Sequence, residues 1–409
     1  MPEPASLRRN RHFQLLWIGQ AASALGSRAS TVAYPLLVLA LTGSPAAAGL
    51  VGFAATIPYL VLQLPAGVLV DRVDRRRAMM ACDAGRLTIL AGVAAAVAMG
   101  QASLPLLIAA AFAEGCLTVV FNLAELSAIQ LLVHSQQMEA ALAQNEARVR
   151  GAGLAGQPLG GFLFGLGRAV PFAADAATYG MSLVTLAAIR RPLVAADTGG
   201  RRHPWTEMVE GLGWLWRQPF LRSTTLIVAG SNGLFQAVIL AVIVVARAHG
   251  ASPAVVGLIL AGWGVGGLAG AAAAAWLGKR LPAAAVVIGA NWVWTALLPV
   301  LALAPRPIVI GAAGAGMAFV GPAWNVVLGS IEMRLTPPAL LRRVQAVQMT
   351  AAYGAIPLGS LIGGLMLDRL GPEEAVWALA ACMLVVAVVA TLTPSVRRPP
   401  VSAPAAASP

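Results

Sequence analysis

The amino-acid sequence predicts an all-α membrane protein with twelve transmembrane helices, arranged as two six-helix bundles related by a pseudo-two-fold axis. Of its 409 residues, 58% are hydrophobic and 11% are charged, and the mean hydropathy is +0.78. Soluble domains carry roughly 25% charged residues, so this composition argues against a soluble enzyme and against a disordered or fibrous chain. The apolar residues form long stretches, and the basic residues collect in alternate connections between these stretches.

A helix needs about 20 apolar residues to cross a bilayer. The first six stretches of sufficient length lie at 13–41, 46–70, 78–99, 103–130, 145–167 and 170–190. The other six lie at 222–247, 253–277, 283–303, 306–331, 343–367 and 373–393. We therefore expect one six-helix bundle over 1–190 and a second over 222–393.

The longest connection, 191–221, separates the two predicted bundles and mixes tryptophans with acidic and basic side chains. This mixture predicts a cytoplasmic linker containing an amphipathic helix that lies at the membrane surface. The segment 394–409 is rich in proline and alanine, which predicts a disordered cytoplasmic tail.

Arginines cluster before the first stretch, in the connection 71–77 and in 191–221, whereas the opposite connections hold few basic residues. Cytoplasmic loops carry such an excess of Lys and Arg, so both termini are expected in the cytoplasm of a multi-pass protein of the plasma (inner) membrane. This topology accounts for the net charge of +12 without a nucleic-acid partner.

The two halves of the sequence resemble each other. Gly156-Gln157-Pro158-Leu159-Gly160-Gly161 in the fifth stretch corresponds to Ala355-Ile356-Pro357-Leu358-Gly359-Ser360 in the eleventh, about half the chain further on. Repeats of six spans are typical of a large class of transporters.

The connection after the second stretch begins with glycine, continues after three residues with Asp-Arg, and ends in a basic cluster. Its principal residues are Gly67, Asp71, Arg72, Arg75 and Arg76. This pattern resembles the signature loop of the major facilitator superfamily, and the resemblance implies a twelve-helix transporter in which the aspartate closes the cytoplasmic side. Asp71 is an anion that the dipole of a helix N-terminus would stabilise, and the helix that starts near Arg342 is the candidate.

Further segments resemble the branch of macrolide-efflux and enterobactin-exporter-like proteins, which are proton-coupled exporters. They are Asn10-Arg11-His12-Phe13, the Asp83 and Arg86 pair, Ala174-Asp175-Ala176 and Pro357-Leu358-Gly359. In the fifth stretch, Gly156, Gln157, Pro158, Gly160 and Gly161 resemble the antiporter motif Gly-Pro-x-x-Gly-Gly, with the proline displaced by one position. The alternative interpretation is close helix packing, because small residues four apart let helices approach.

Charged residues inside the predicted spans are costly and usually face a cavity or a partner. Glu114 and Arg28 lie about midway along the fourth and first spans, and Glu114 is the predicted proton carrier. The alternative is a fixed Glu114–Arg28 ion pair. Asp83 and Arg86 are three residues apart and can pair on one helix face. Glu125 lies near the cytoplasmic end of the fourth span, where a gate or loop contact is expected.

Aromatic and polar residues at mid-span are expected to form an adaptable substrate cavity, with helix packing as the alternative for each. They are Tyr34, Phe121, Asn232, Phe235, Gln236, Trp263, Asn291, Trp324 and Asn325. Asp175 and Glu332 lie near span ends, where a cap or an interface contact is expected. The scattered cysteines and histidines indicate neither a metal nor a cofactor, and no catalytic constellation indicates an enzyme.

The expected partners are a small-molecule substrate, protons and the lipid bilayer, and a monomer is expected. The resemblance implies proton-driven export of amphipathic molecules such as drugs or natural products. Two alternatives stay open at this point: a siderophore or metabolite transporter of the same fold, and a non-transporting receptor, scaffold or lipid-moving protein.

Overall fold

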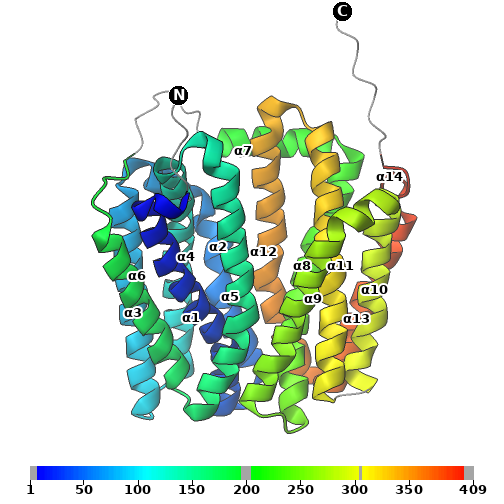
Figure 1. The fold of residues 1–409 in the computed structure, drawn as a ribbon. Helices are drawn as coiled ribbons and strands as arrows, with labels where there is room; N and C mark the ends of the chain where they lie inside the picture. Colours follow the sequence, from blue (N-terminus) through cyan, green and yellow to red (C-terminus); the bar gives the residue numbers. More distant parts are fainter. Residues whose placement is uncertain (1–6, 195–203, 304–305, 400–409) are drawn as a thin grey trace, which may run out of the picture. The chain divides into compact units, whose positions relative to one another are not determined.

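The computed structural model describes residues 7–194, 204–303 and 306–399, and these residues are almost entirely helical (Figure 1). Twelve long helices correspond to the twelve predicted spans. In the first half they are α1 (Arg11–Thr42), α2 (Pro45–Arg72), α3 (Arg75–Ala98), α4 (Leu104–Leu132), α5 (Met138–Leu166) and α6 (Val170–Ala188). In the second half they are α8 (Pro219–Ala248), α9 (Pro253–Arg280), α10 (Ala283–Leu303), α11 (Pro307–Leu335), α12 (Pro338–Leu370) and α13 (Pro372–Leu392).

Two shorter α-helices are also present, and single turns of 3-10 helix lie at Leu7–Arg9 and Ser135–Gln137. The helix α7 (Pro204–Trp216) lies in the segment for which an amphipathic linker helix is predicted. The helix α14 (Pro394–Arg397) forms one turn at the start of the predicted tail, and residues 400–409 of that tail lie outside the described part of the chain.

Several helices begin or end at residues that are good helix caps. Asn10 precedes α1, and its side chain accepts a hydrogen bond from the backbone N–H of Phe13 at 3.1 Å. The helix α1 ends at Gly43, whose φ of 68° lies in the left-handed region that favours glycine. Asp74 caps α3 through the backbone N–H groups of Arg76 and Arg77. Eight of the long helices carry proline in their first turn, where no N–H partner is lost.

Ten of the long helices are long and apolar enough to cross a membrane by length and composition. The two that do not reach this measure are α5 and α6. The first half of α5 carries Glu139, Glu146, Arg148 and Arg150, and α6 carries Asp175 among alanine, threonine and serine residues. These polar groups lower the hydropathy of α5 and α6 relative to the other spans.

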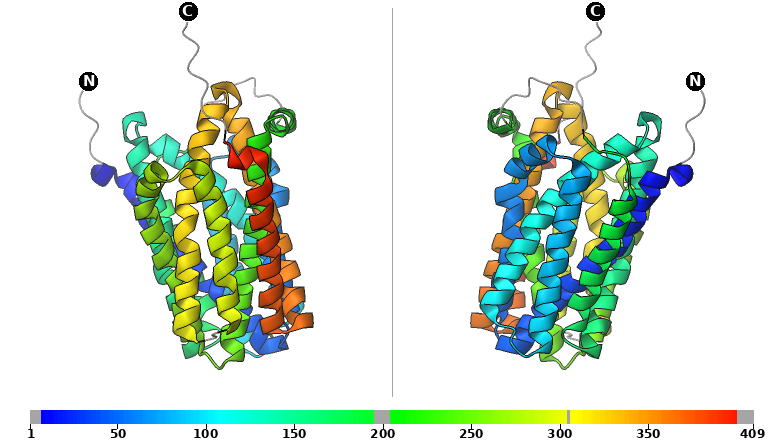
Figure 2. Two further views of the ribbon diagram at one scale, coloured as in Figure 1. Left: turned by 90° about the vertical axis from the view of Figure 1, so that its right-hand side faces the viewer. Right: turned by 90° about the vertical axis from the view of Figure 1, so that its left-hand side faces the viewer.

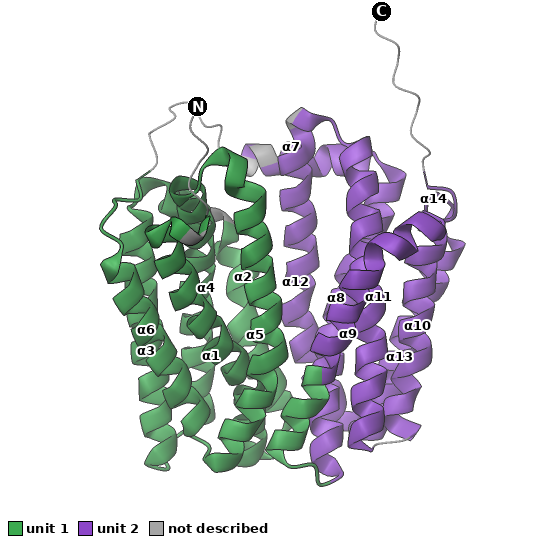
Figure 3. Cartoon of the chain, viewed as in Figure 1, with its two compact units in different colours: residues 1–198, 250–261 green, residues 199–249, 262–409 purple. Residues whose placement is uncertain are grey.

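The chain divides into two compact units, coloured separately in Figure 3. Unit 1 comprises residues 1–198 and 250–261, and unit 2 comprises 199–249 and 262–409. The boundary in α9 places its first turns with unit 1. Within each unit the long helices run alongside one another, as the two views of Figure 2 show.

Close helix packing inside each unit depends on glycine. A Cβ at Gly160 of α5 would lie 2.4 Å from the backbone oxygen of Ala29 in α1, so only glycine allows this approach. In unit 2, a Cβ at Gly359 of α12 would lie 1.9 Å from the backbone oxygen of Gly233 in α8. The corresponding segments of the sequence repeat therefore make the same kind of helix contact in the two units.

Gly160→Ala is expected to destabilise unit 1 by about 1–3 kcal/mol, because the added methyl group forces α1 and α5 apart. The matched control is Gly165→Ala on the same helix, where a Cβ meets nothing within 4 Å. Thermal unfolding of the purified protein in detergent measures both. Equal melting temperatures for the two variants would show that the α1–α5 contact is not tight.

Candidate functional site

A cluster of charged side chains lies in the core of unit 1, where α1, α3, α4 and α6 meet. Asp83 and Arg86, one turn apart on α3, form an ion pair and are both buried, as their spacing predicts. The guanidinium of Arg86 lies over two aromatic rings, 4.2 Å from the centroid of Phe121 and 4.4 Å from that of Tyr179. Aromatic faces attract cations, so these rings stabilise a buried charge.

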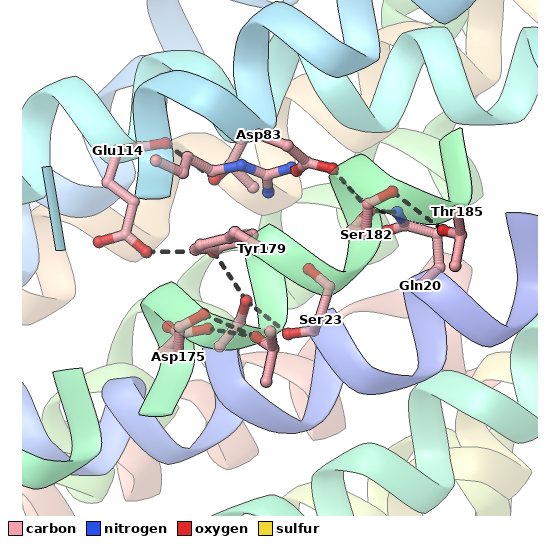
Figure 4. Close-up of polar contacts among 12 residues, drawn as sticks. Gln20, Ser23, Asp83, Glu114, Asp175, Tyr179, Ser182 and Thr185 are labelled. Atoms are coloured by element: carbon pink, nitrogen blue, oxygen red, sulfur yellow. Dashed lines mark hydrogen bonds and ion pairs between the residues drawn. The ribbon is translucent and has the colours of Figure 1, made fainter. Parts of the chain in front are cut away.

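Asp83 also accepts a hydrogen bond from the Ser182 hydroxyl at 2.6 Å, and the side-chain amide of Gln20 donates to that hydroxyl at 2.8 Å (Figure 4). Phe121 is 1% exposed beneath Arg86. In this structure its ring is the platform for a cation, and its place in a substrate cavity stays a prediction.

Glu114 lies near the middle of α4, half-buried, and is bound by hydroxyl groups. The hydroxyl of Tyr34 donates to Glu114 Oε2 at 3.2 Å, and that of Tyr179 donates to Oε1 at 3.5 Å. The Tyr179 hydroxyl lies 2.9 Å from Ser27 Oγ, which extends the polar contacts to α1 (Figure 4). The Tyr34 ring packs edge-on against Phe172 at a centroid distance of 5.0 Å.

The structure contradicts the interpretation of Glu114 and Arg28 as a fixed ion pair. No ion pair joins them, although both belong to the described residues, and the Arg28 side chain is exposed. The Cβ of Arg28 lies against α5, where a Cβ at Gly156 would approach it to 2.6 Å. The two side chains lie at similar depth along their spans, but they do not face each other. The buried arginine in the core that contains Glu114 is Arg86.

Asp175, for which a cap or an interface contact was predicted, is a second acid in this core. It is 0% exposed, and Thr178 donates to its Oδ1 at 3.2 Å. A signal was present in the sequence: Asp175, Thr178, Tyr179 and Ser182 recur at helical spacing, which places polar groups along one face of α6. Figure 4 shows Asp175, Tyr179 and Ser182 along α6, beside Gln20 and Ser23 of α1.

At another point of unit 1, Glu125 Oε1 forms an ion pair with Arg148 Nη1 at 2.8 Å, joining α4 to α5. Both side chains are almost completely buried. Glu125 was predicted to make a gate or loop contact, and Arg148 was not predicted as its partner. The pair fixes two helices in this structure, and its role as a gate stays a prediction.

The signature loop is tied to unit 1 by its arginines. Arg76 donates to the backbone oxygens of Leu186 and Ala187, each at 2.8 Å, and so caps the C-terminus of α6. Asp71 Oδ1 lies 3.5 Å from Arg75 Nη2, and Arg75 is buried. Gly67 has open space around its Cβ position, and Arg72 is exposed. The contact predicted between Asp71 and the helix that starts near Arg342 joins the two units and stays a prediction.

Arg76→Ala is expected to lower the free energy of unfolding by about 1–3 kcal/mol, because two carbonyl oxygens at the end of α6 lose a charged donor. The matched control is Arg77→Ala, an exposed neighbour in the same loop. A detergent melting curve that shifts equally for both variants would contradict a capping role for Arg76.

The remaining glycine of the antiporter-like motif faces a different helix. A Cβ at Gly161 would lie 2.3 Å from the Pro253 oxygen, and a Cβ at Gly257 would lie 2.8 Å from the Gln157 oxygen and 3.0 Å from the Cα of Pro158. The motif thus packs against α1 through Gly156 and Gly160, and against the first turns of α9 through Gly161. These contacts agree with the packing interpretation; a coupling role for the motif stays a prediction.

Unit 2 contains a cavity of about 740 Å³ between α8, α11 and α12. Its lining includes five residues predicted to face a substrate: Asn232, Phe235, Gln236, Trp324 and Asn325. It also includes residues that were not predicted to face a substrate, chiefly Thr225, Glu332, Gln345, Gln348, Met349 and Tyr353. Glu332 therefore faces a cavity, whereas a cap or an interface contact was expected from its place near a span end.

An aromatic cluster supports this cavity. Phe235 packs edge-on against Trp294 at 4.8 Å and against Trp263 at 6.1 Å, and Trp294 packs against Trp324 at 4.9 Å. Trp263 therefore stands behind the cavity wall. Asn291 is 0% exposed and donates to the Val287 oxygen of its own helix at 2.8 Å; it does not line this cavity, and its role in substrate binding stays a prediction.

Comparisons with known proteins agree with this architecture. A model of the family described as transmembrane secretion effectors matches residues 4–407. The multidrug efflux pump Tap of Mycolicibacterium fortuitum is 27% identical over 401 residues, which cover 94% of this chain and 96% of the pump. An uncharacterized MFS-type transporter of Sinorhizobium fredii is also 27% identical, covering 93% of this chain and 94% of that protein.

Two solved structures share the fold at low sequence identity. The nucleoside transporter NupG superposes with a TM-score of 0.74 at 11% identity, covering 93% of this chain and 98% of that chain. A bacterial homologue of the iron transporter ferroportin superposes with a TM-score of 0.71 at 15% identity, covering 95% and 99%. The predicted major facilitator fold is confirmed, and this chain belongs to the transmembrane secretion effector family of major facilitator superfamily transporters.

Proposed function

We propose that this protein exports amphipathic small molecules from the cell, using the entry of protons as the energy source. It would do so by alternating access, with the 1–190 and 222–393 bundles moving relative to each other across the membrane. Export as the direction is supported by relatives named multidrug efflux pumps that match over 94% of the chain. In this proposal the protein is a monomer in the plasma membrane with both termini in the cytoplasm.

The observation that carries proton coupling is the environment of Glu114. Its carboxyl group is bound by the hydroxyls of Tyr34 and Tyr179 and has no ion pair within the described residues. A hydroxyl group donates to a carboxylate and accepts from a carboxylic acid, so these two partners satisfy either protonation state. An arginine paired with Glu114 would instead hold the carboxylate in its charged form. The surroundings of Glu114 therefore suit a group that gains and loses a proton in each cycle.

Arg86 can serve as the fixed charge of this site. Its ion pair with Asp83 and its two aromatic contacts hold it in place whether or not Glu114 carries a proton. Asp83 is fully occupied by Arg86 and Ser182, so it is a weaker candidate for the carrier than Glu114.

The test uses inside-out membrane vesicles that contain the protein, with ethidium as the transported dye. If export is driven by protons, ethidium accumulates inside vesicles whose interior is acidic, and nigericin, which collapses the pH gradient, stops the accumulation. Vesicles without the protein provide the control. Equal accumulation with and without the gradient would refute proton coupling, and movement of ethidium out of the vesicles would refute export.

The proposed orientation gives a separate prediction. Single cysteines introduced at exposed Arg72 and at exposed Arg397 are expected to react with a membrane-impermeant maleimide in inside-out vesicles and not in intact cells, because the basic loops are assigned to the cytoplasm. The native cysteines are replaced by alanine in the parent. Labelling in intact cells would reverse the assigned orientation.

A further inference from the structure

The residues that line the cavity of unit 2 include an acidic side chain but no basic one. Its lining comprises apolar and aromatic side chains, uncharged amides and hydroxyls, and a single ionisable acid, Glu332. The lining contains no lysine, arginine or histidine. A bound molecule therefore meets one side chain that can carry a negative charge in this cavity and none that can carry a positive charge.

Neutral partners hold Glu332 in place. The side-chain amide of Gln348 on α12 lies between Glu332 on α11 and Thr225 on α8. In the amide orientation that satisfies both neighbours, its nitrogen donates to Glu332 Oε1 at 2.8 Å and Oε2 at 3.1 Å, and its oxygen accepts from Thr225 Oγ1 at 3.3 Å. These contacts orient the carboxyl group without neutralising a negative charge on it. Within the described residues, no ion pair involves Glu332.

We propose that this cavity binds organic cations and that Glu332 is the residue that selects for positive charge. The inference rests on the proposed transport function and specifies its substrate class. A half-buried carboxylate attracts a cation more strongly than it would in bulk water, because the surrounding dielectric is lower. The aromatic faces of Phe235, Trp324 and Tyr353 in the same lining add attraction for a positive charge and for flat apolar groups.

The volume fits this class of ligand. Pockets for small organic molecules measure roughly 300–1,000 Å³, and the cavity of about 740 Å³ lies within that range. The amides of Asn232 and Gln236 provide polar contacts around a mostly apolar body. An organic cation with aromatic substituents satisfies the charge, the rings and the space together.

The experiment measures equilibrium binding to the purified full-length protein in detergent, without any gradient. The probes are tetraphenylphosphonium and tetraphenylborate, which have nearly the same shape and opposite charges. Equilibrium dialysis is expected to show saturable binding of the phosphonium. The affinity for the borate is expected to be lower by a factor of about ten or more. Equal affinity for the two ions, or no saturable phosphonium binding, would overturn the proposal, and this comparison needs no variant.

Variants then test the assigned residue. Glu332→Gln is expected to weaken phosphonium binding about ten-fold and to narrow the difference between the two ions, whereas Glu332→Asp retains the charge and most of the affinity. The matched control is Glu146→Gln, the same chemical change at an exposed acid of unit 1. A melting curve verifies that each variant is folded. Unchanged selectivity in Glu332→Gln would assign the charge preference to another group.

This binding test is independent of transport. If phosphonium binds in a Glu332-dependent way but is not moved by a pH gradient in vesicles, the cavity assignment stands and the proposed export fails. If ethidium export is gradient-driven while phosphonium binding ignores Glu332, the export proposal stands and the cavity assignment fails.

Discussion

Glu114→Gln is expected to abolish the gradient-dependent part of ethidium export while leaving the binding of ligands to the purified protein intact. Glutamine keeps the size of the side chain and its contacts with the Tyr34 and Tyr179 hydroxyls, but it cannot take up or release a proton. Transport in inside-out vesicles with and without an imposed pH gradient measures the effect. The variant should show the same slow rate in both conditions.

The control for this substitution is Glu146→Gln, which removes an exposed acid paired with Arg150 on α5. It is expected to retain the full response to the gradient. If Glu114→Gln also retains that response, Glu114 is not the carrier, and Asp175 in the same core becomes the next residue to replace.

Asp83→Ala is expected to lower the free energy of unfolding by about 3–5 kcal/mol, because it leaves the Arg86 guanidinium buried without its ion-pair partner. Thermal unfolding in detergent, followed by circular dichroism, measures the loss. The double variant Asp83→Ala/Arg86→Leu removes both charges and should recover part of the stability, since apolar residues replace a buried pair with little penalty.

Two results would contradict this account of the pair. One is a single variant that melts at the wild-type temperature, which would mean that water or another group compensates Arg86. The other is a double variant no more stable than Asp83→Ala, which would mean that Arg86 contributes by its packing on Phe121 and Tyr179 alone.

Ten of the twelve long helices were directly predictable because hydropathy along the chain reports on membrane spans. The polar groups of α5 and α6 weaken that signal, and there prolines and glycines helped to mark the helix ends. The Asp83–Arg86 pair was predictable because a spacing of three residues on one helix fixes two side chains on the same face. Close helix packing at Gly156 and Gly160 was predictable from a similar local rule, since small residues four apart form a flat helix surface. That the partner is α1 was not predictable from this spacing.

Contacts between different helices were harder to predict from the sequence. Glu114 and Arg28 lie at similar depth, but depth does not say toward which neighbour a side chain points. The buried arginine of this core is Arg86, which pairs with Asp83. Phe121 and Asn291 were predicted to line a cavity because they are aromatic or polar residues at mid-span. Membrane helices are apolar all round, so the sequence does not show which face of the helix is buried against its neighbours. Asp175 and Glu332 were discounted for lying near span ends, although the side-chain contacts of each decide its role.

The most direct test of proton coupling through Glu114 measures protons themselves. Proteoliposomes with trapped pyranine, and with the membrane potential clamped by potassium and valinomycin, are given an ethidium gradient and no initial pH gradient. The wild-type protein is expected to move protons opposite to ethidium, seen as a change in pyranine fluorescence, and Glu114→Gln is expected to move none. An ethidium-driven proton flux in Glu114→Gln equal to that of the wild type would contradict the assignment of Glu114 as the proton carrier.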